Sequence, residues 1–148
     1  MSNEAMGKKK VVIINGPNLN LTGLREPEIY GKTGFQEYIG ILKQKFTDTE
    51  IVYFQSNSEG AIIDELHKYG FDTNIGIVLN AGAYSHYSIA IADAIRAITV
   101  PVIEVHLSNI YSREEYRHNS VTAPACKGII AGFGMQGYEL AIRAIIND

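Results

Sequence analysis

The sequence predicts an α/β fold in which a parallel sheet of five strands is doubly wound, with helices covering both faces. Five short runs of β-branched and other apolar residues recur along the 148 residues, each long enough for one buried strand. Amphipathic segments with apolar residues three or four positions apart separate most of these runs. Strands that alternate with helices favour a parallel sheet with right-handed crossovers.

The apolar runs define the predicted strands. The first is followed by the turn formers Asn15-Gly16-Pro17, and the fourth opens on a proline, which is tolerated at the first position of a strand. We expect strands at Val11–Ile14, Ile51–Gln55, Ile75–Leu79, Pro101–Val105 and Gly128–Phe133. Residues 1–9 are expected to be a flexible tail or a remnant of expression, and residues 10–148 a single domain.

Helical periodicity and end signals support four helices. An apolar stripe runs along the first, while Ser58 opens the second and Gly70 ends it. The third is expected to pack through a face of apolar and small residues at Ile89, Ala92, Ile95 and Ala97. The predicted helices are Phe35–Phe46, Ser58–Tyr69, Ser85–Ile98 and Gly137–Ile146.

Residues 18–32 show neither helical nor alternating periodicity. Gly23, Pro27 and Gly31 interrupt the segment, which also carries Arg25 and Tyr30. A loop of this length in a short chain is usually functional or disordered. We therefore predict a mobile lid here, in which the charge of Arg25 favours the phenolate form of Tyr30.

The strand order that we expect is 2-1-3-4-5, which makes the fold flavodoxin-like with three αβα layers. In that order the loops after Ile14 and Leu79 flank one crevice, where the direction of winding reverses. Ligands of open α/β sheets bind in such a crevice, outside the carboxyl ends of the strands. The functional residues are therefore expected at this edge of the sheet.

Composition narrows the possible partners. A net charge of −3 argues against nucleic acid, and no apolar stretch reaches the roughly 18 residues of a membrane helix. Cys126 is the one cysteine, which excludes an intrachain disulfide and fits a reducing, cytoplasmic location. With four histidines and no ligand spacing of cysteines and histidines, we expect no metal site.

Glu104 and His106 are the strongest candidate pair. Residues two apart on a strand point to the same side, so this carboxylate and this imidazole are expected to be neighbours. A carboxylate that orients an imidazole is typical of acid–base catalysis, and a structural ion pair is an equal alternative. Arg113 and Arg117 suit recognition of an anion or hydroxylated ring from one helical turn, or form surface pairs with neighbouring glutamates.

The remaining candidates are weaker when taken singly. Asn80 precedes Ala81-Gly82, which is also common turn chemistry, and His86 is expected in the first turn of the third helix. Asp93, seven residues later on the same face, is favoured as a solvated helix carboxylate. Asn18 is placed to donate a hydrogen bond into the crevice, to an enolate or a water molecule.

Six segments in order carry a resemblance to a known family. They are Gly16–Asn20, Arg25–Gly31, Gln55–Gly60, Leu79–His86, Ile103–Asn109 and Arg113–Arg117. The chain closely resembles the type II 3-dehydroquinate dehydratases of the shikimate pathway, from about Val11 to Asn147. The resemblance implies removal of water from 3-dehydroquinate to give 3-dehydroshikimate, by anti elimination through an enolate without metal or organic cofactor.

The same resemblance implies residue roles. Tyr30 matches the general base, Arg25 and Arg113 the groups that lower its pKa, and His106, oriented by Glu104, the acid that protonates the leaving hydroxyl. The other matched positions are Asn18 for a bound water, Asn80, Leu107 and Ser108 for the substrate carboxylate, His86 and Arg117 for the ring hydroxyls, and Asp93 for reaching a neighbouring subunit. This last role implies a dodecamer built from trimers. Tyr87 stands where the family commonly has threonine.

Rival functions lack their expected motifs. A flavin- or nucleotide-binding module needs a Ser/Thr-rich or glycine-rich phosphate loop after the first strand, and Gly16-Pro17-Asn18-Leu19 supplies neither. A receiver domain needs acidic residues where Asn15 and Asn80 stand. The lysine-dependent dehydratases need a barrel of about 250 residues, so this chain is too short.

Overall fold

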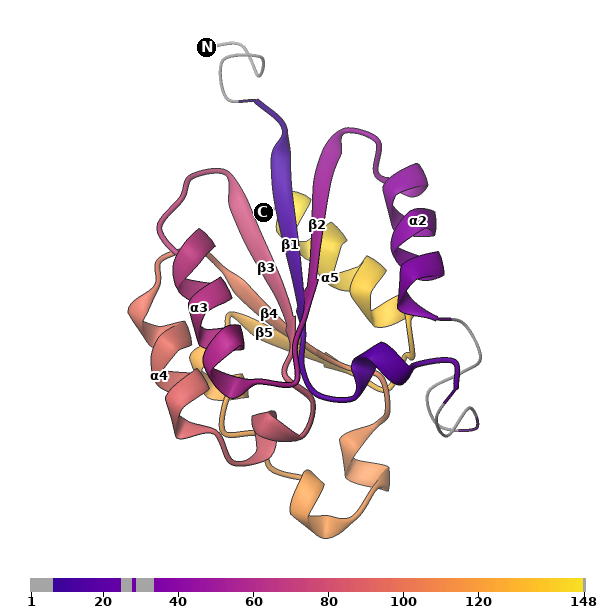
Figure 1. Cartoon of the computed structure of the whole chain (residues 1–148), viewed down its shortest axis with the longest axis vertical. Helices are drawn as coiled ribbons and strands as arrows, with labels where there is room; N and C mark the ends of the chain where they lie inside the picture. The colour runs from indigo at the N-terminus through magenta and orange to yellow at the C-terminus, as the bar shows by residue number, and fades with distance from the viewer. Residues whose placement is uncertain (1–6, 25–27, 29–33, 148) are drawn as a thin grey trace.

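The computed structural model describes residues 7–24, 28 and 34–147. Within them, five parallel strands form one sheet in the order β2-β1-β3-β4-β5, which confirms the predicted order and the flavodoxin-like fold (Figure 1). The strands are β1 (Lys9–Asn15), β2 (Thr49–Gln55), β3 (Ile75–Asn80), β4 (Val102–His106) and β5 (Gly128–Ala131). None of the helices in the described residues has the length and apolar character needed to cross a membrane.

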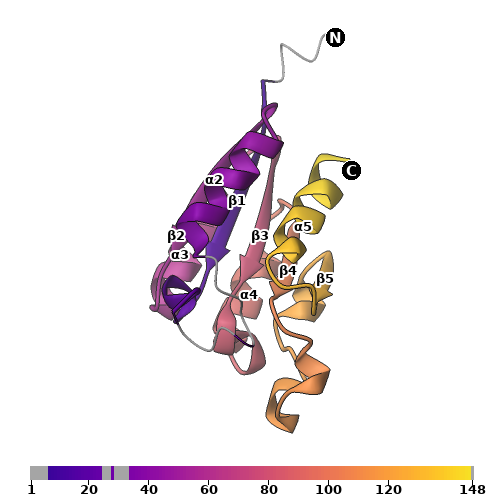
Figure 2. The same cartoon turned by 90° about the vertical axis from the view of Figure 1, so that its right-hand side faces the viewer.

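Helices cover both faces of the sheet, which lies between them in Figure 1 and is seen face-on in Figure 2. Alternate β1 residues point to opposite faces because a strand repeats every two residues. Val11 and Ile13 lie in the core beneath α2 (Phe35–Lys45) and α5 (Gln136–Ile146). Val12 and Ile14 lie in the second core, beneath α3 (Glu59–Tyr69) and α4 (Ile89–Ala97). The predicted three-layer arrangement is therefore confirmed.

The helix predicted at Ser85–Ile98 is wrong at its start. Residues Gly82–His86 form a separate 3₁₀ helix, η3, and α4 begins only after Ser88, whose hydroxyl accepts a hydrogen bond from the Ile91 amide at 3.0 Å. A serine that caps the first turn defines the helix start. Two members of the predicted packing face, Ile89 and Ala97, are exposed, and Ile91 and Ala94 are buried instead.

Strand boundaries also shift. β4 begins at Val102, although the Pro101 carbonyl still accepts from the Ile77 amide at 2.9 Å. β5 ends at Ala131 and not at Phe133, because Gly132 adopts a positive φ of 99° that extended strands do not use.

The loops after β1 and β3 meet at the carboxyl edge of the sheet, the lower end in Figure 1. The Gly16 amide donates to the Asn80 carbonyl at 2.7 Å. A Cβ atom at Gly16 would lie 2.5 Å from the Ala81 oxygen, so only glycine allows this approach. The segment between β4 and β5 extends beyond the same edge and carries η4 (Ile110–Ser112), η5 (Glu115–Arg117) and η6 (Ala123–Ala125).

Candidate active site

A pocket of about 130 Å³ opens at this carboxyl edge. Its walls come from the loop after β1, from η3, and from the segment that follows β4. Eight of the predicted site residues line it, namely Asn18, Asn80, His86, His106, Leu107, Ser108, Arg113 and Arg117. This pocket lies at the predicted location, the crevice outside the strand ends.

Glu104 and His106 form the predicted contact on β4. His106 Nε2 lies 2.7 Å from Glu104 Oε2, and their side chains are 6% and 0% exposed. Burial alone would raise the pKa of Glu104, but hydrogen bonds from His106, Ser120 and Thr122, with the charge of His106, outweigh it and lower that pKa. Glu104 is thus a buried anion, and His106 keeps Nδ1 for a ligand in the pocket.

His86 lies at the end of η3, beside the first imidazole. Its ring centroid is 5.9 Å from that of His106, and its Nδ1 donates to the Asn119 carbonyl at 2.9 Å. Burial lowers the pKa of His86, the bond to Asn119 opposes this, and the charges of His106 and Arg117 lower it further. His86 is therefore neutral at pH 7, with Nε2 left to contact a ligand.

Asn80 is held by a directional chain of hydrogen bonds that sequence reasoning missed. The Tyr138 hydroxyl donates to Asn15 Oδ1 at 2.8 Å, so it accepts from Asn80 Nδ2, also at 2.8 Å. The Gly82 amide donates to Asn80 Oδ1 at 3.1 Å. Both amide atoms are thereby oriented, and the second N–H of Nδ2 remains for the pocket. Complete burial raises the pKa of Tyr138, so its phenol stays neutral.

Arg113 follows η4 and Arg117 is the last residue of η5, so the expected single helical turn is wrong, although both side chains line the pocket. Arg113 Nη1 donates to Ser108 Oγ at 3.2 Å. Arg117 Nε lies 2.5 Å from Glu114, a surface pairing of the kind that the sequence left as the alternative. Together they give this wall of the pocket a positive charge that suits an anion or hydroxylated ligand.

Asn18 lines the pocket from the loop after β1. Its backbone has a φ of 69°, in the left-handed region that asparagine tolerates better than most residues. The Asn57 side chain accepts from the Asn18 amide at 3.0 Å and from Gln55 Nε2 at 3.2 Å, which ties the turn after β1 to the end of β2. Tyr87, by contrast, is 63% exposed and packs on Tyr84, outside the pocket lining.

Among the described residues, the predicted site residue Asp93 does not line the pocket. Asp93 lies exposed on α4, 3.8 Å from Arg96, and the expectation that it shares a helical face with His86 is wrong because His86 precedes the helix. Arg25 and Tyr30 lie outside the described residues, as do residues 26, 27, 29, 31 and 32 of the predicted lid.

The chemistry that this arrangement supports is acid–base work on a small anionic molecule. One imidazole is backed by a buried carboxylate, a second is neutral, and two guanidinium groups supply positive charge. In the described part of the chain, no three His, Cys, Asp or Glu side chains gather as metal ligands.

Comparison with known proteins agrees with this geometry. The family profile described as Dehydroquinase class II matches residues 9–146. The 3-dehydroquinate dehydratase of Caldicellulosiruptor saccharolyticus is 54% identical over 140 residues, which cover 93% of this chain and 96% of that protein. The type II dehydroquinase structure from Butyrivibrio crossotus is 44% identical, with a TM-score of 0.90 over 94% of this chain and 98% of that one. The corresponding structure from Propionibacterium acnes is 40% identical, with a TM-score of 0.90 over 96% and 99%. The chain therefore belongs to the class II dehydroquinase family of hydro-lyases.

Proposed function

We propose that the chain removes water from 3-dehydroquinate to give 3-dehydroshikimate, a step of the shikimate pathway toward aromatic amino acids, by anti elimination through an enolate. The observation that carries this proposal is the buried Glu104–His106 pair, which opens on a pocket with two arginines in its wall. Relatives named 3-dehydroquinate dehydratase, identical at about half of the aligned positions, support the choice of substrate.

The substrate carboxylate is seated by the Asn80 side chain and by the backbone amides of Leu107 and Ser108. The free N–H that the Tyr138 bond leaves on Asn80 supports this role. Neutral His86 and cationic Arg117 bind the ring hydroxyls, since one accepts and the other donates hydrogen bonds.

Proton transfer begins at C2. Tyr30 acts as the general base, Arg25 and Arg113 favour its phenolate, and the electron pair of the C2–H bond moves into the C3 carbonyl to form the enolate. Free tyrosine has a pKa of about 10, and each unit of lowering corresponds to about 1.4 kcal/mol of phenolate stabilisation. The assignment of Tyr30 and Arg25 rests on the Arg25–Gly31 motif.

The second step expels the C1 hydroxyl. The enolate returns its electron pair to form the C1–C2 double bond, and protonated His106 gives its Nδ1 proton to the departing oxygen, which leaves as water. Anionic Glu104 stabilises the imidazolium that this step requires. Asn18 holds a water molecule that donates to the enolate oxygen while the negative charge is there.

Asp93 serves the site of a neighbouring subunit, and the active assembly is a dodecamer built from trimers. Its exposure on α4, away from the pocket of its own chain, supports this role because such a carboxylate is accessible to a second copy.

The test is an ultraviolet assay of the enone product with His106→Ala. We expect turnover to fall at least about a hundredfold, while solvent deuterium still enters C2, because general acid catalysis contributes about 10²–10⁴. His67→Ala removes an exposed histidine on α3 and is the control. Unchanged turnover in His106→Ala would reject the acid, and normal turnover in Tyr30→Phe would reject the base.

A further inference from the structure

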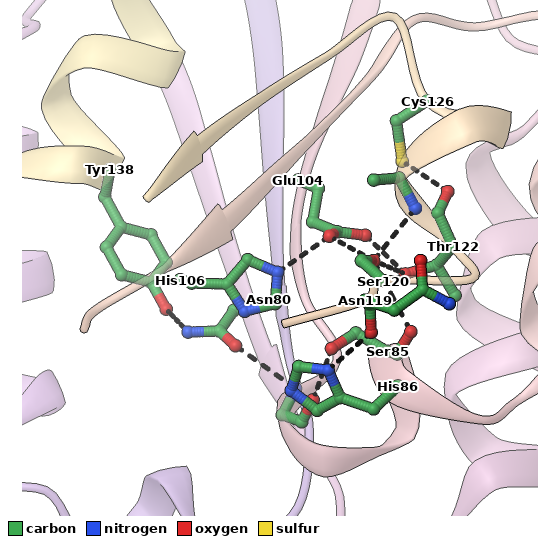
Figure 3. A network of polar contacts seen from close by, with 12 residues as sticks. Asn80, Ser85, His86, Glu104, His106, Asn119, Ser120, Thr122, Cys126 and Tyr138 are labelled. Carbon is green, nitrogen blue, oxygen red and sulfur yellow. Dashed lines mark hydrogen bonds and ion pairs between the residues drawn. The ribbon is translucent and has the colours of Figure 1, made fainter. Parts of the chain in front are cut away.

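Two hydroxyl side chains with no part in the proposed steps point at the buried carboxylate of Glu104 (Figure 3). Ser120 Oγ donates to Oε2 at 2.6 Å, and Thr122 Oγ1 donates to Oε1. His106 Nε2 lies on Oε2 as well, at 2.7 Å. Both oxygens of a carboxylate with no exposed surface therefore have a donor.

These hydroxyls are directed to Glu104 in preference to local partners. Thr122 is the N-cap residue of η6, yet its side chain makes no capping bond there. Ser120 Oγ instead accepts from the Ala123 amide at 3.0 Å. The two hydroxyl oxygens are 3.2 Å apart, close enough to bond each other, but each has a nearer acceptor in the carboxylate. The single proton of each hydroxyl thus goes to Glu104.

The segment that carries them is fastened to the pocket wall. The Val121 amide donates to the Ser85 carbonyl at 2.8 Å, and the Asn119 carbonyl accepts from His86 Nδ1 at 2.9 Å. On the other side, the Cys126 thiol donates to the Thr122 carbonyl at 3.4 Å. These bonds fix the backbone of residues 119–122, so the two hydroxyls are held in place before any ligand binds.

We propose that Ser120 and Thr122 are positioning residues that keep Glu104 an anion and hold it in line with His106. The proposal rests on the proposed function, in which His106 is the acid. Removal of a carboxylate from water favours its neutral form, and hydrogen bonds donated to the charged form oppose this. A protonated Glu104 would neither stabilise the imidazolium nor fix its orientation.

Among the described residues that face Glu104, the donors that stabilise its anion, apart from His106, are the neutral hydroxyls of Ser120 and Thr122. The titratable neighbours are His106 on β4, His86 on η3 and Cys126 after η6. None of them carries negative charge at neutral pH. Among the described residues, the ion pair of Glu104 is with His106, so an arginine or lysine does not compete with the imidazolium.

The decisive variant is Thr122→Val, which keeps the side-chain shape and removes the hydroxyl. The first readout is infrared titration of protein with ¹³C-labelled glutamate, following the protonated carboxyl band that is missing in Glu104→Gln. We expect the protonation midpoint to rise by about one pH unit, a tenfold change in the proton equilibrium. We also expect kcat to fall about tenfold with KM within about twofold, because the substrate contacts remain intact. Thr122→Ser, which restores the hydroxyl, should return both values toward those of the parent.

The outcomes separate the inference from the proposed function. The infrared titration needs no turnover, so lack of dehydratase activity in the parent would count against the proposed function alone. An unshifted midpoint in Thr122→Val, or a shift that Thr122→Ser fails to reverse, would overturn the inference. If Thr122→Val does not fold, Ser120→Ala removes the other donor, and its midpoint decides in the same way.

Discussion

Tyr138→Phe removes one hydroxyl and should show how much the buried hydrogen bonds of Tyr138 contribute to stability, apart from the apolar packing of the core. The Tyr138 side chain is fully buried, and its hydroxyl makes two hydrogen bonds of 2.8 Å, to Asn15 and from Asn80. Phenylalanine fills nearly the same space and keeps the edge contact with Phe35, so apolar packing changes little. The variant therefore isolates the hydrogen bonds.

The expected cost follows from the groups left unpaired. Asn15, which is 0% exposed, loses the donor to its Oδ1, and a buried unsatisfied group costs about 1–3 kcal/mol. Asn80 is 3% exposed but lines the pocket, so its N–H turns to water and adds less. We expect a loss of about 2–3 kcal/mol in unfolding free energy, or about 4–12 °C in Tm for a chain of this size.

Denaturant unfolding at fixed protein concentration measures this loss, with an unchanged m-value as the sign that the native structure is retained. Tyr38→Phe is the matched control, because Tyr38 packs against the same ring and its hydroxyl makes no hydrogen bond among the described residues. That control should lie within about 0.5 kcal/mol of the parent. A Tyr138→Phe value within the same range would refute the reasoning.

Three further predictions use the same structure. Gly16→Ala should destabilise the protein by about 2 kcal/mol and reduce activity, because the new Cβ would lie 2.5 Å from the Ala81 backbone oxygen. Gly40→Ala is the control and should not destabilise, because nothing lies within 4 Å of the position of its Cβ. Thermal unfolding of both variants checks this. The pKa of Glu104 is lowered, so its stabilising contribution is present above the ordinary value of 4.5 and is lost as the pH falls below it. The unfolding free energy should therefore fall less steeply with decreasing pH in Glu104→Gln than in the parent. Identical curves for the two proteins would contradict this. Burial, with the charge of Glu104, raises the pKa of Cys126 to about 12. Alkylation of its thiol by iodoacetamide at pH 8.5, followed by mass spectrometry, should therefore be at least about a hundredfold slower than alkylation of a free cysteine. Rapid labelling would contradict the burial.

Residue types and the spacing of apolar residues were sufficient to predict those features that depend on neighbouring residues in the sequence. The five strands and the Glu104–His106 contact follow from apolar runs and from the two-residue repeat of a strand, and both are confirmed. The strand order was chosen among the orders open to a doubly wound sheet, and it is confirmed as well. The start of α4 was not predictable in this way, because Ser85 and Ser88 are both acceptable cap residues. The choice of Ser88 depends on tertiary contact, since its hydroxyl also donates to Glu59 on α3.

The partners that complete the site lie far away in sequence. Ser120 and Thr122 are 16 and 18 residues from Glu104, in a segment of 3₁₀ turns without a repeating pattern. Tyr138 is 123 residues from Asn15. Pairings of this kind depend on how the chain returns to the same edge of the sheet, and a single sequence carries no local signal for them. The strand-end positions of Asn15 and Asn80 were the available hint that polar partners had to be supplied there.

The choice of donors around Glu104 explains how one edge of the sheet combines stability with acid chemistry. A buried carboxylate needs hydrogen bonds, and an arginine would provide strong ones. A fixed guanidinium would, however, satisfy the charge permanently and repel a proton on His106. The hydroxyls of Ser120 and Thr122 donate to the anion without adding charge, so His106 is the side chain among the described residues that can pair with it as a cation. The two guanidinium groups line the pocket instead. In the proposed reaction, neutral donors behind the carboxylate and cations around the substrate would divide two tasks that one set of arginines could not perform together.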